Sequence, residues 1–219
     1  MTIKWSFLGQ TPYERALALQ KDLRAQLIEG SAVDFFLLLT HPPVVTRGYS
    51  ERGDSGLLQP RETFSKEGIP IIDVDRGGKT TYHGPDQLVG YLIFDLTRRG
   101  LKPREFVETV AHVLIEVLDS YGIEATYNEE DPGVEVDGRK IAFLGFNIHR
   151  GITMHGFSLN LGRDLKPFSY IVPCGKMGRQ ITSMEELTGM SFSIFDAYWR
   201  VVTVMGHHFN DNMEEVFPD

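Results

Sequence analysis

Cys174 is the only cysteine in the chain, and it stands in a turn between Pro173 and Gly175. Lys176 and Arg179 follow it closely. Cations and free backbone N–H groups lower the pKa of a thiol from about 8.5 and increase the fraction of reactive thiolate. A lone free cysteine is more often a small buried apolar residue. The local sequence therefore leaves a catalytic nucleophile and a structural residue both open.

Lys140 opens an otherwise apolar segment, KIAFLGF. A lysine at the end of a hairpin commonly extends its ammonium group into water, and this is the simpler interpretation. The alternative is a lysine drawn into a partly apolar pocket, where it can exchange protons near neutral pH.

Residues 76–91 read RGGKTTYHGPDQLVGY and lead into an apolar segment, residues 88–96. The glycines and the proline predict sharp bends or close approach of the backbone to a ligand, and the apolar segment predicts a buried strand. The stretch lacks both G-x-x-x-x-G-K-[ST] and G-x-G-x-x-G, which weakens an ATP- or dinucleotide-dependent function. We expect a ligand to bind at this loop.

His83 and His155 each precede a glycine, in Tyr82-His83-Gly84 and Met154-His155-Gly156. Each can be a structural histidine bonded to backbone or an acid or base in a site, and sequence alone does not decide. The seven histidines show no paired ligand spacing, so no metal site is predicted.

The elements that must position these residues alternate irregularly. Two helices are expected to begin at capping boxes, at residues 11–14 and at residues 183–186. Three more are expected at residues 62–68, 103–121 and 193–209. In the last of these, Phe195, Trp199, Val202 and Met205 form one apolar stripe. Strands are expected at residues 33–39, 69–74, 88–96, 123–127, 134–136, 140–148 and 152–161, with Asp137-Gly138 as a hairpin turn and the last two segments antiparallel. This pattern predicts a single α+β domain, residues 1–219, with a mixed, largely antiparallel sheet flanked by helices.

Composition narrows the function classes. The formal net charge is −8, so the chain as a whole lacks the excess of basic residues that is typical of nucleic-acid-binding proteins. One cysteine in 219 residues is compatible with a reducing compartment. No segment approaches the roughly 20 apolar residues of a membrane span, and the N-terminus does not resemble a signal peptide. We expect a cytoplasmic monomer that does not bind membranes.

Four ordered motifs carry a family resemblance: RGGKTTYHGPDQLVGY at residues 76–91, GRKIAFLGF at 138–146, TMHGFSLNL at 153–161, and PCG at 173–175. Together they resemble the octanoyl-[acyl-carrier-protein]:protein N-octanoyltransferases of lipoate biosynthesis, over residues 36–187. The resemblance implies the α+β fold of biotin-protein ligases and lipoate ligases.

The resemblance also implies a mechanism in which Cys174 takes an octanoyl group from the phosphopantetheine thioester of acyl carrier protein. Lys140 would lower the thiol pKa and shuttle protons. The acceptors would be apo lipoyl domains of 2-oxoacid dehydrogenases and the glycine cleavage H protein, and no cofactor is expected. Residues implied to bind substrate are Arg76, Gly77, Gly78, Lys79, Thr80, Thr81, Tyr82, His83, Phe143, Leu144, Gly145, Gly156, Phe157 and Ser158.

The chain departs from the family pattern at Asp86, where glycine is usual, at Leu92, where proline is usual, and at Glu135, where tryptophan is usual. If position 86 requires a positive φ, aspartate would be strained there. It would also place a negative charge near the thiol. The alternatives are an ATP-dependent lipoate or biotin ligase and a carrier-binding homologue without turnover. A cysteine hydrolase is a further alternative, for which the sequence gives no separate support.

An acidic carrier would need a local basic patch on this acidic chain. The candidates are Lys176 and Arg179 beside Cys174, and the linker residues Arg98, Arg99, Lys102 and Arg104.

Overall fold

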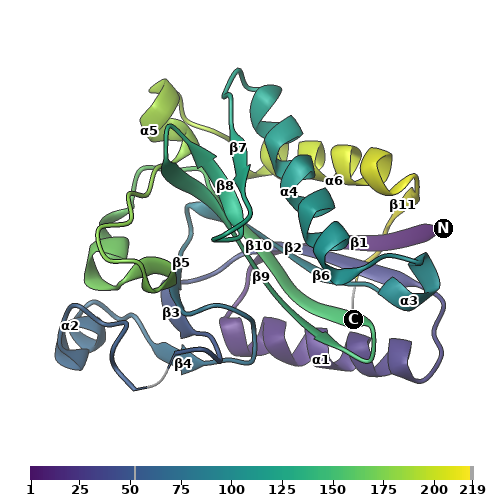
Figure 1. The fold of residues 1–219 in the computed structure, drawn as a ribbon, viewed down its shortest axis with the longest axis horizontal. Helices are drawn as coiled ribbons and strands as arrows, with labels where there is room; N and C mark the ends of the chain where they lie inside the picture. The colour runs from purple at the N-terminus through teal and green to yellow at the C-terminus, as the bar shows by residue number, and fades with distance from the viewer. Residues whose placement is uncertain (52, 218–219) are drawn as a thin grey trace.

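A computed structural model of the protein describes residues 1–51 and 53–217. Its centre is an eight-stranded sheet in the order β11-β1-β2-β6-β10-β9-β8-β7. β1 pairs in parallel with β11 and β2, and the other pairings of this sheet are antiparallel. A three-stranded sheet, β4-β3-β5, lies beside it (Figure 1). The prediction of a mixed, largely antiparallel sheet is confirmed.

The strands are β1 (Thr2–Gln10), β2 (Asp34–Thr40), β3 (Val44–Arg47), β4 (Ile71–Asp73), β5 (Thr80–His83), β6 (Gln87–Ile93), β7 (Thr126–Asn128), β8 (Gly133–Val136), β9 (Arg139–His149), β10 (Ile152–Asn160) and β11 (Asn212–Glu215). The helices are α1 (Tyr13–Ile28), α2 (Arg61–Lys66), α3 (Leu96–Arg99), α4 (Pro103–Asp119), α5 (Met184–Thr188) and α6 (Ile194–Phe209). Two 3-10 turns, Lys166–Tyr170 and Pro173–Gly175, follow β10. No helix in the described part of the chain is both long and apolar enough to cross a membrane.

Helices cover both faces of the large sheet, with α1 on one side and α4 and α6 on the other (Figure 1). The side chains of β2 therefore alternate between two cores. Phe36 and Leu38 pack into the cluster that contains α4 and α6, and Leu37 and Leu39 pack into the cluster under α1. Burial on both faces explains why this strand is a continuous apolar run.

Of the predicted caps and turns, one was wrong and two are confirmed. Thr11 does not cap α1, because Pro12 is the N-cap residue and the Thr11 hydroxyl donates to the Leu8 carbonyl instead. The second predicted cap is confirmed, since the Glu186 N–H donates to the Ser183 hydroxyl. The hairpin turn is also confirmed: Asp137 and Gly138 both have positive φ between β8 and β9.

Half of the predicted stripe on α6 is confirmed, because Val202 and Met205 are buried. The other half is wrong, since Phe195 and Trp199 are 59% and 47% exposed and Tyr198 and Val201 are buried in their place. The strand β1, which the sequence analysis did not predict, packs against this helix: its Phe7 stacks on Tyr198, with ring centroids 4.4 Å apart.

Candidate active site

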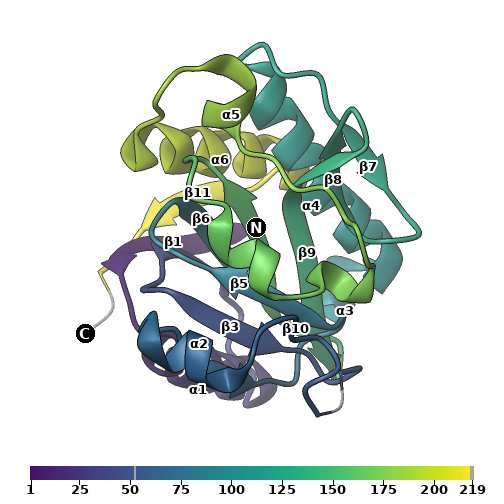
Figure 2. The ribbon, with the colours of Figure 1, turned by 90° about the vertical axis from the view of Figure 1, so that its left-hand side faces the viewer.

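The turn that carries Cys174 crosses in front of β5, on the side of the molecule that Figure 2 presents. Cys174 has φ 54° and ψ 16°, and Gly175 has φ 68°, so two successive residues are left-handed. This conformation is uncommon for a residue with a Cβ. It follows Pro173, and the Gly175 N–H donates to the Val172 carbonyl, which closes the turn. The backbone therefore bends sharply at Cys174, the residue that carries the sulfur.

Lys140 enters the site from β9, and its side chain is fully buried. Its Nζ lies 3.7 Å from the Sγ of Cys174, 3.0 Å from Oδ1 of Asp131 and 3.1 Å from the Asp131 carbonyl oxygen. Gly133 of β8 makes this path possible, because a Cβ there would collide with Cε of Lys140. The simpler interpretation, a hairpin lysine that reaches water, is therefore wrong, and the alternative of a lysine drawn into a partly apolar pocket agrees with this burial.

Asp131 also holds the two cations that follow the cysteine in sequence. Its Oδ2 lies 3.1 Å from Nη2 of Arg179 and 3.8 Å from Nζ of Lys176, and Arg179 forms a second ion pair with Glu135. These cations face carboxylates rather than the sulfur. Our expectation that Lys176 and Arg179 activate the thiol was therefore wrong.

Burial raises the pKa of the Cys174 thiol, and the Lys140 ammonium group is the strongest opposing influence. Asp131 raises this pKa further, and Arg76 lowers it. The expected lowering of the thiol pKa below its usual value is therefore not found in the free protein. Lys140 instead limits a shift that burial alone would make larger.

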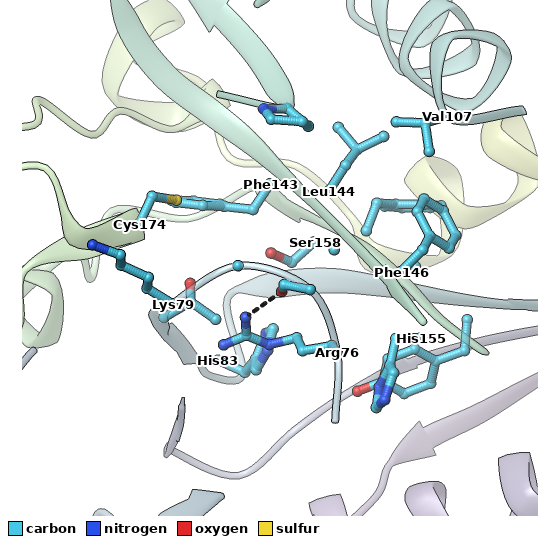
Figure 3. Close-up of a pocket in the computed structure, with 18 of the residues that line it drawn as sticks. Arg76, Lys79, His83, Val107, Phe143, Leu144, Phe146, His155, Ser158 and Cys174 are labelled. Atoms are coloured by element: carbon cyan, nitrogen blue, oxygen red, sulfur yellow. Dashed lines mark hydrogen bonds between the residues drawn. The ribbon is translucent and has the colours of Figure 1, made fainter. Parts of the chain in front are cut away.

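A cavity of about 340 Å³ opens beside Cys174 (Figure 3). It is lined by most of the residues implied to bind substrate: Arg76, Gly77, Gly78, Lys79, Thr80, Thr81, His83, Phe143, Leu144, Gly145, Gly156, Phe157 and Ser158. Phe143, Leu144, Phe146, Ile148 and Val107 give it an apolar side. A volume of this size suits a small-molecule site.

Tyr82 is the exception among the predicted lining residues. Its ring packs edge-on against Phe168, with centroids 5.6 Å apart, and it belongs to a separate core cluster. Alternation along β5 explains this, because Thr81 and His83 face the cavity and Tyr82 must face the opposite side. Contrary to our prediction, Tyr82 does not line this cavity.

A buried polar cluster around His41 packs against two residues that line the cavity, His83 and Tyr91. His41 Nδ1 lies 2.6 Å from the Thr11 carbonyl oxygen and Nε2 lies 2.7 Å from the Tyr91 hydroxyl. Because a carbonyl only accepts, Nδ1 carries the proton and Nε2 accepts from Tyr91. Burial lowers the pKa of His41 to about 4 and that of His83 well below its ordinary value. These histidines are therefore neutral near pH 7.

His155, which the sequence left open, lines the cavity. Its Nε2 is 2.9 Å from Oδ1 of Asp75, and its φ is 62°. Burial lowers its pKa, although Asp75 opposes that change, and the histidine in turn lowers the pKa of Asp75. Nε2 therefore donates to an ionised carboxylate, which fixes the tautomer of the ring.

Residues 12–206 match the model of the lipoyl protein ligase A/B catalytic domain. The chain belongs to this family. An octanoyltransferase of Alkaliphilus metalliredigens is 37% identical over 209 residues, which cover 95% of each chain.

Two solved structures share the lipoyl protein ligase A/B fold at low sequence identity. A bipartite lipoate protein ligase from Thermoplasma acidophilum, studied with its E2 lipoyl domain, has a TM-score of 0.79 at 14% identity, covering 100% of this chain and 88% of its own. The biotin protein ligase of Aquifex aeolicus with biotin and ATP has a TM-score of 0.56 at 11% identity, covering 96% and 69%. These identities establish the fold alone, and the predicted fold resemblance is confirmed.

The departures from the lipoyl protein ligase A/B motifs are accommodated locally. Asp86 is exposed and is not among the described residues with positive φ, so the strain that we considered does not arise. It is also absent from the charges that shift the Cys174 pKa. Glu135 accepts from Asn128 and pairs with Arg179, and Leu92 is fully buried in the sheet.

The predicted basic linker of this family member is largely neutralised. Arg98 and Arg99 both pair with the buried carboxylate of Asp34, and the Arg99 side chain is 5% exposed. Arg104 pairs with Glu108 and Glu129. The expectation of a free basic patch at residues 98–104 was therefore wrong, with only Lys102 exposed and without a carboxylate among the described residues.

Sequence reasoning missed some cavity residues: Tyr13, Tyr91, Val107, Asp131, Pro132, Phe146 and Ile148. Phe146 and Tyr91 are the last residues of the motifs at 138–146 and 76–91, so counting each whole motif as cavity lining would have found them. Tyr13 and Val107 belong to helices that the sequence places only by their apolar faces. Nothing local to either residue signals a cavity.

Proposed function

We propose that the protein transfers an octanoyl group from octanoyl-acyl carrier protein to a specific lysine of apo lipoyl domains, through an acyl thioester on Cys174. The observation that carries this proposal is the position of the sulfur. It lines the cavity and lies 3.7 Å from the buried Nζ of Lys140. A thiolate there meets the carbonyl carbon of an acyl group whose chain occupies the apolar side of the cavity.

In the first half-reaction, the Cys174 sulfur forms a bond to the thioester carbonyl carbon and the bond to the pantetheine sulfur breaks. The proton lost by the Cys174 thiol ends on the departing pantetheine sulfur, and Lys140 is the group placed to relay it. The Gly77 N–H cannot stabilise the oxyanion in this arrangement, because it donates to the Phe146 carbonyl.

In the second half-reaction, the ε-amine of a lipoyl-domain lysine forms a C–N bond and the bond to the Cys174 sulfur breaks. One amine proton returns to that sulfur. The acyl group is held as a thioester both on acyl carrier protein and on Cys174, so it is already activated in each half-reaction. Neither ATP nor a bound cofactor is therefore required. Support for a lipoyl-domain acceptor comes from the Thermoplasma ligase of the same fold, whose partner is its E2 lipoyl domain.

We place the reaction in the cytoplasm. The chain contains one cysteine, and the mechanism requires it as a free thiol, which a reducing compartment preserves. The acceptors in this proposal are the lipoyl domains of 2-oxoacid dehydrogenases and the glycine cleavage H protein.

The test is intact-mass analysis after incubation with octanoyl-acyl carrier protein without ATP. The expected result is one octanoyl adduct on Cys174, lost in Cys174→Ala and discharged by added apo lipoyl domain. Transfer that survives Cys174→Ala and demands ATP would instead identify a ligase. Carrier binding without any adduct would identify a homologue that does not turn over.

A further inference from the structure

Two hydroxyl groups in the acyl cavity have no hydrogen-bond partner among the described residues. They are Oγ of Ser158 and Oγ1 of Thr81, and both atoms are buried. Ser158 is 1% exposed and Thr81 is 6% exposed, and both residues line the cavity. Buried hydroxyls in folded proteins nearly always have a partner. These two groups are therefore suited to a ligand that brings a polar atom.

Ser158 lies near the reacting end of the cavity. It is the direct partner of Phe143 across β10 and β9, so the two side chains lie side by side on one face. The Phe143 ring centroid is 5.4 Å from Nζ of Lys140, which is 3.7 Å from the sulfur. In Figure 3 the Ser158 hydroxyl points toward the Cys174 side of the cavity and away from Phe146 and Val107.

Thr81 approaches from the other sheet, on the side of Arg76. It is the register partner of Thr46, and Thr46 accepts from the buried Arg76 guanidinium through both Oγ1 and its carbonyl oxygen. No carboxylate among the described residues pairs with Arg76, and its guanidinium donates to Thr46 and to the Gly77 carbonyl. The Thr81 hydroxyl beside it is left without a partner. The complementary ligand atom is an acceptor oxygen.

A simple octanoyl thioester brings one such atom, the carbonyl oxygen, which has two lone pairs. Those lone pairs can accept a hydrogen bond from each of the two hydroxyls. A carbonyl oxygen has no hydrogen to donate, however, so the acceptor lone pairs of Ser158 and Thr81 stay without a donor. A hydroxyl on a carbon close to the carbonyl would supply a second oxygen, and a hydroxyl both accepts and donates, as those of Ser158 and Thr81 do.

We propose that the cavity also accepts medium-chain acyl thioesters with a hydroxyl group on the β-carbon, and that Ser158 and Thr81 bind this hydroxyl. The inference rests on the proposed function, because the same thioester exchange on Cys174 is used. The bond between the acyl carbon and Cys174 forms, the bond to the donor sulfur breaks, and the hydroxyl takes no part in the step. The substrate class is thus the β-hydroxyacyl thioester as well as the unsubstituted acyl thioester.

The test compares acylation of Cys174 by the N-acetylcysteamine thioesters of octanoate and of each enantiomer of 3-hydroxyoctanoate, followed by intact mass. A hydroxyl buried without a partner is expected to slow acylation by about tenfold to a hundredfold. With partners in place, we expect one enantiomer to react within about tenfold of octanoate. A larger deficit for both enantiomers overturns the inference, while the octanoyl adduct in the same experiment reports separately on the proposed function.

The double variant Ser158→Ala and Thr81→Val tests the assigned partners. We expect the ratio of octanoyl to 3-hydroxyoctanoyl rates to rise at least about tenfold, with Ser191→Ala at an exposed position as the matched control. An unchanged ratio, including the case in which both donors slow equally because the hydroxyls serve the carbonyl oxygen, overturns the inference. A thermal melt of each variant shows that the ratio is measured on folded protein.

Discussion

The Nζ of Lys140 lies 3.7 Å from the Sγ of Cys174, although the two residues are 34 positions apart in the chain. Lys140 is fully buried and is held by Asp131, so its ammonium group cannot turn away toward water. The pKa of the thiol is then set by two opposing causes: burial raises it and Lys140 lowers it. Because burial prevails, acylation should speed up as the pH rises from neutral.

Replacement of Lys140 by methionine keeps most of the side-chain volume and removes the charge. Since the thiol loses the cation that opposes burial, its pKa rises further, and thiolate forms only at higher pH. We expect acylation at pH 7 to slow by at least about tenfold and the pH–rate profile to move upward. Alkylation of Cys174 by iodoacetamide across pH measures this.

Lys176→Met is the matched control for that experiment. Lys176 also faces Asp131, but it is half exposed and lies 3.8 Å from the carboxylate. Its loss should leave the profile almost unchanged. A profile for Lys140→Met that coincides with the wild type would contradict the assigned role.

Asp131→Asn should separate stability from reactivity. The carboxylate raises the pKa of Cys174, so its neutralisation should lower that pKa and increase alkylation near pH 7. The same change leaves the buried ammonium group of Lys140 without its counter-ion, which typically costs about 3–5 kcal/mol. Urea unfolding and iodoacetamide alkylation of one variant measure both effects. A more stable variant, or one with a less reactive thiol, would refute this account.

The sequence predicted what lies within single motifs and failed where distant segments meet. The strands that carry Lys140 and Ser158 were predicted because apolar runs and the Asp137-Gly138 turn are local signals. Lys176 and Arg179 were misjudged because Asp131, which neutralises them, lies in the turn between β7 and β8 and not in the adjacent chain. A charge next to a cysteine in sequence says nothing about the carboxylates that folding brings to that charge.

The strands β1 and β11 were missed for the same reason, because their pairing joins distant segments of the chain. β1 and β11 pair in parallel with each other although they stand at opposite ends of the chain. β11 reads NMEE, a short and polar edge strand, and carries no apolar pattern. The pairing of Cys174 with Lys140 came from the family resemblance, since no periodicity or spacing links two residues on different elements.

His41 should make the protein sensitive to acid. Burial lowers its folded-state pKa to about 4, below its ordinary value of 6.5, so the unfolded chain binds this proton more readily. The stabilisation is complete above pH 6.5 and is lost as the pH falls toward 4, with a limit of about 3 kcal/mol. His41→Gln retains an N–H donor and an oxygen acceptor, and should flatten the dependence of unfolding free energy on pH in this window. Urea unfolding at pH values from 7 to 4 measures this dependence, with His207→Gln at an exposed position as the control. If the unfolding free energy falls with pH equally in the two variants, His41 is not the cause.

Lys79 is the cation best placed to meet an acidic carrier protein. It is exposed, it lines the mouth of the cavity, and its side chain lies over Gly175, where an added Cβ would come 2.7 Å from Nζ (Figure 3). No carboxylate pairs with it among the described residues, in contrast to Arg98, Arg99 and Arg179.

Lys79→Ala should therefore raise KM for octanoyl-acyl carrier protein by about two- to fivefold, the size of one exposed charge contact. Transfer from octanoyl-N-acetylcysteamine, which has no protein surface, should change little. Added salt should weaken wild-type transfer from the carrier more than transfer by the variant, because the variant has already lost the screened contact. Lys102→Ala, an exposed lysine in the linker, is the matched control. If Lys79→Ala slows both donors equally, Lys79 acts on the thioester itself and not on the carrier surface.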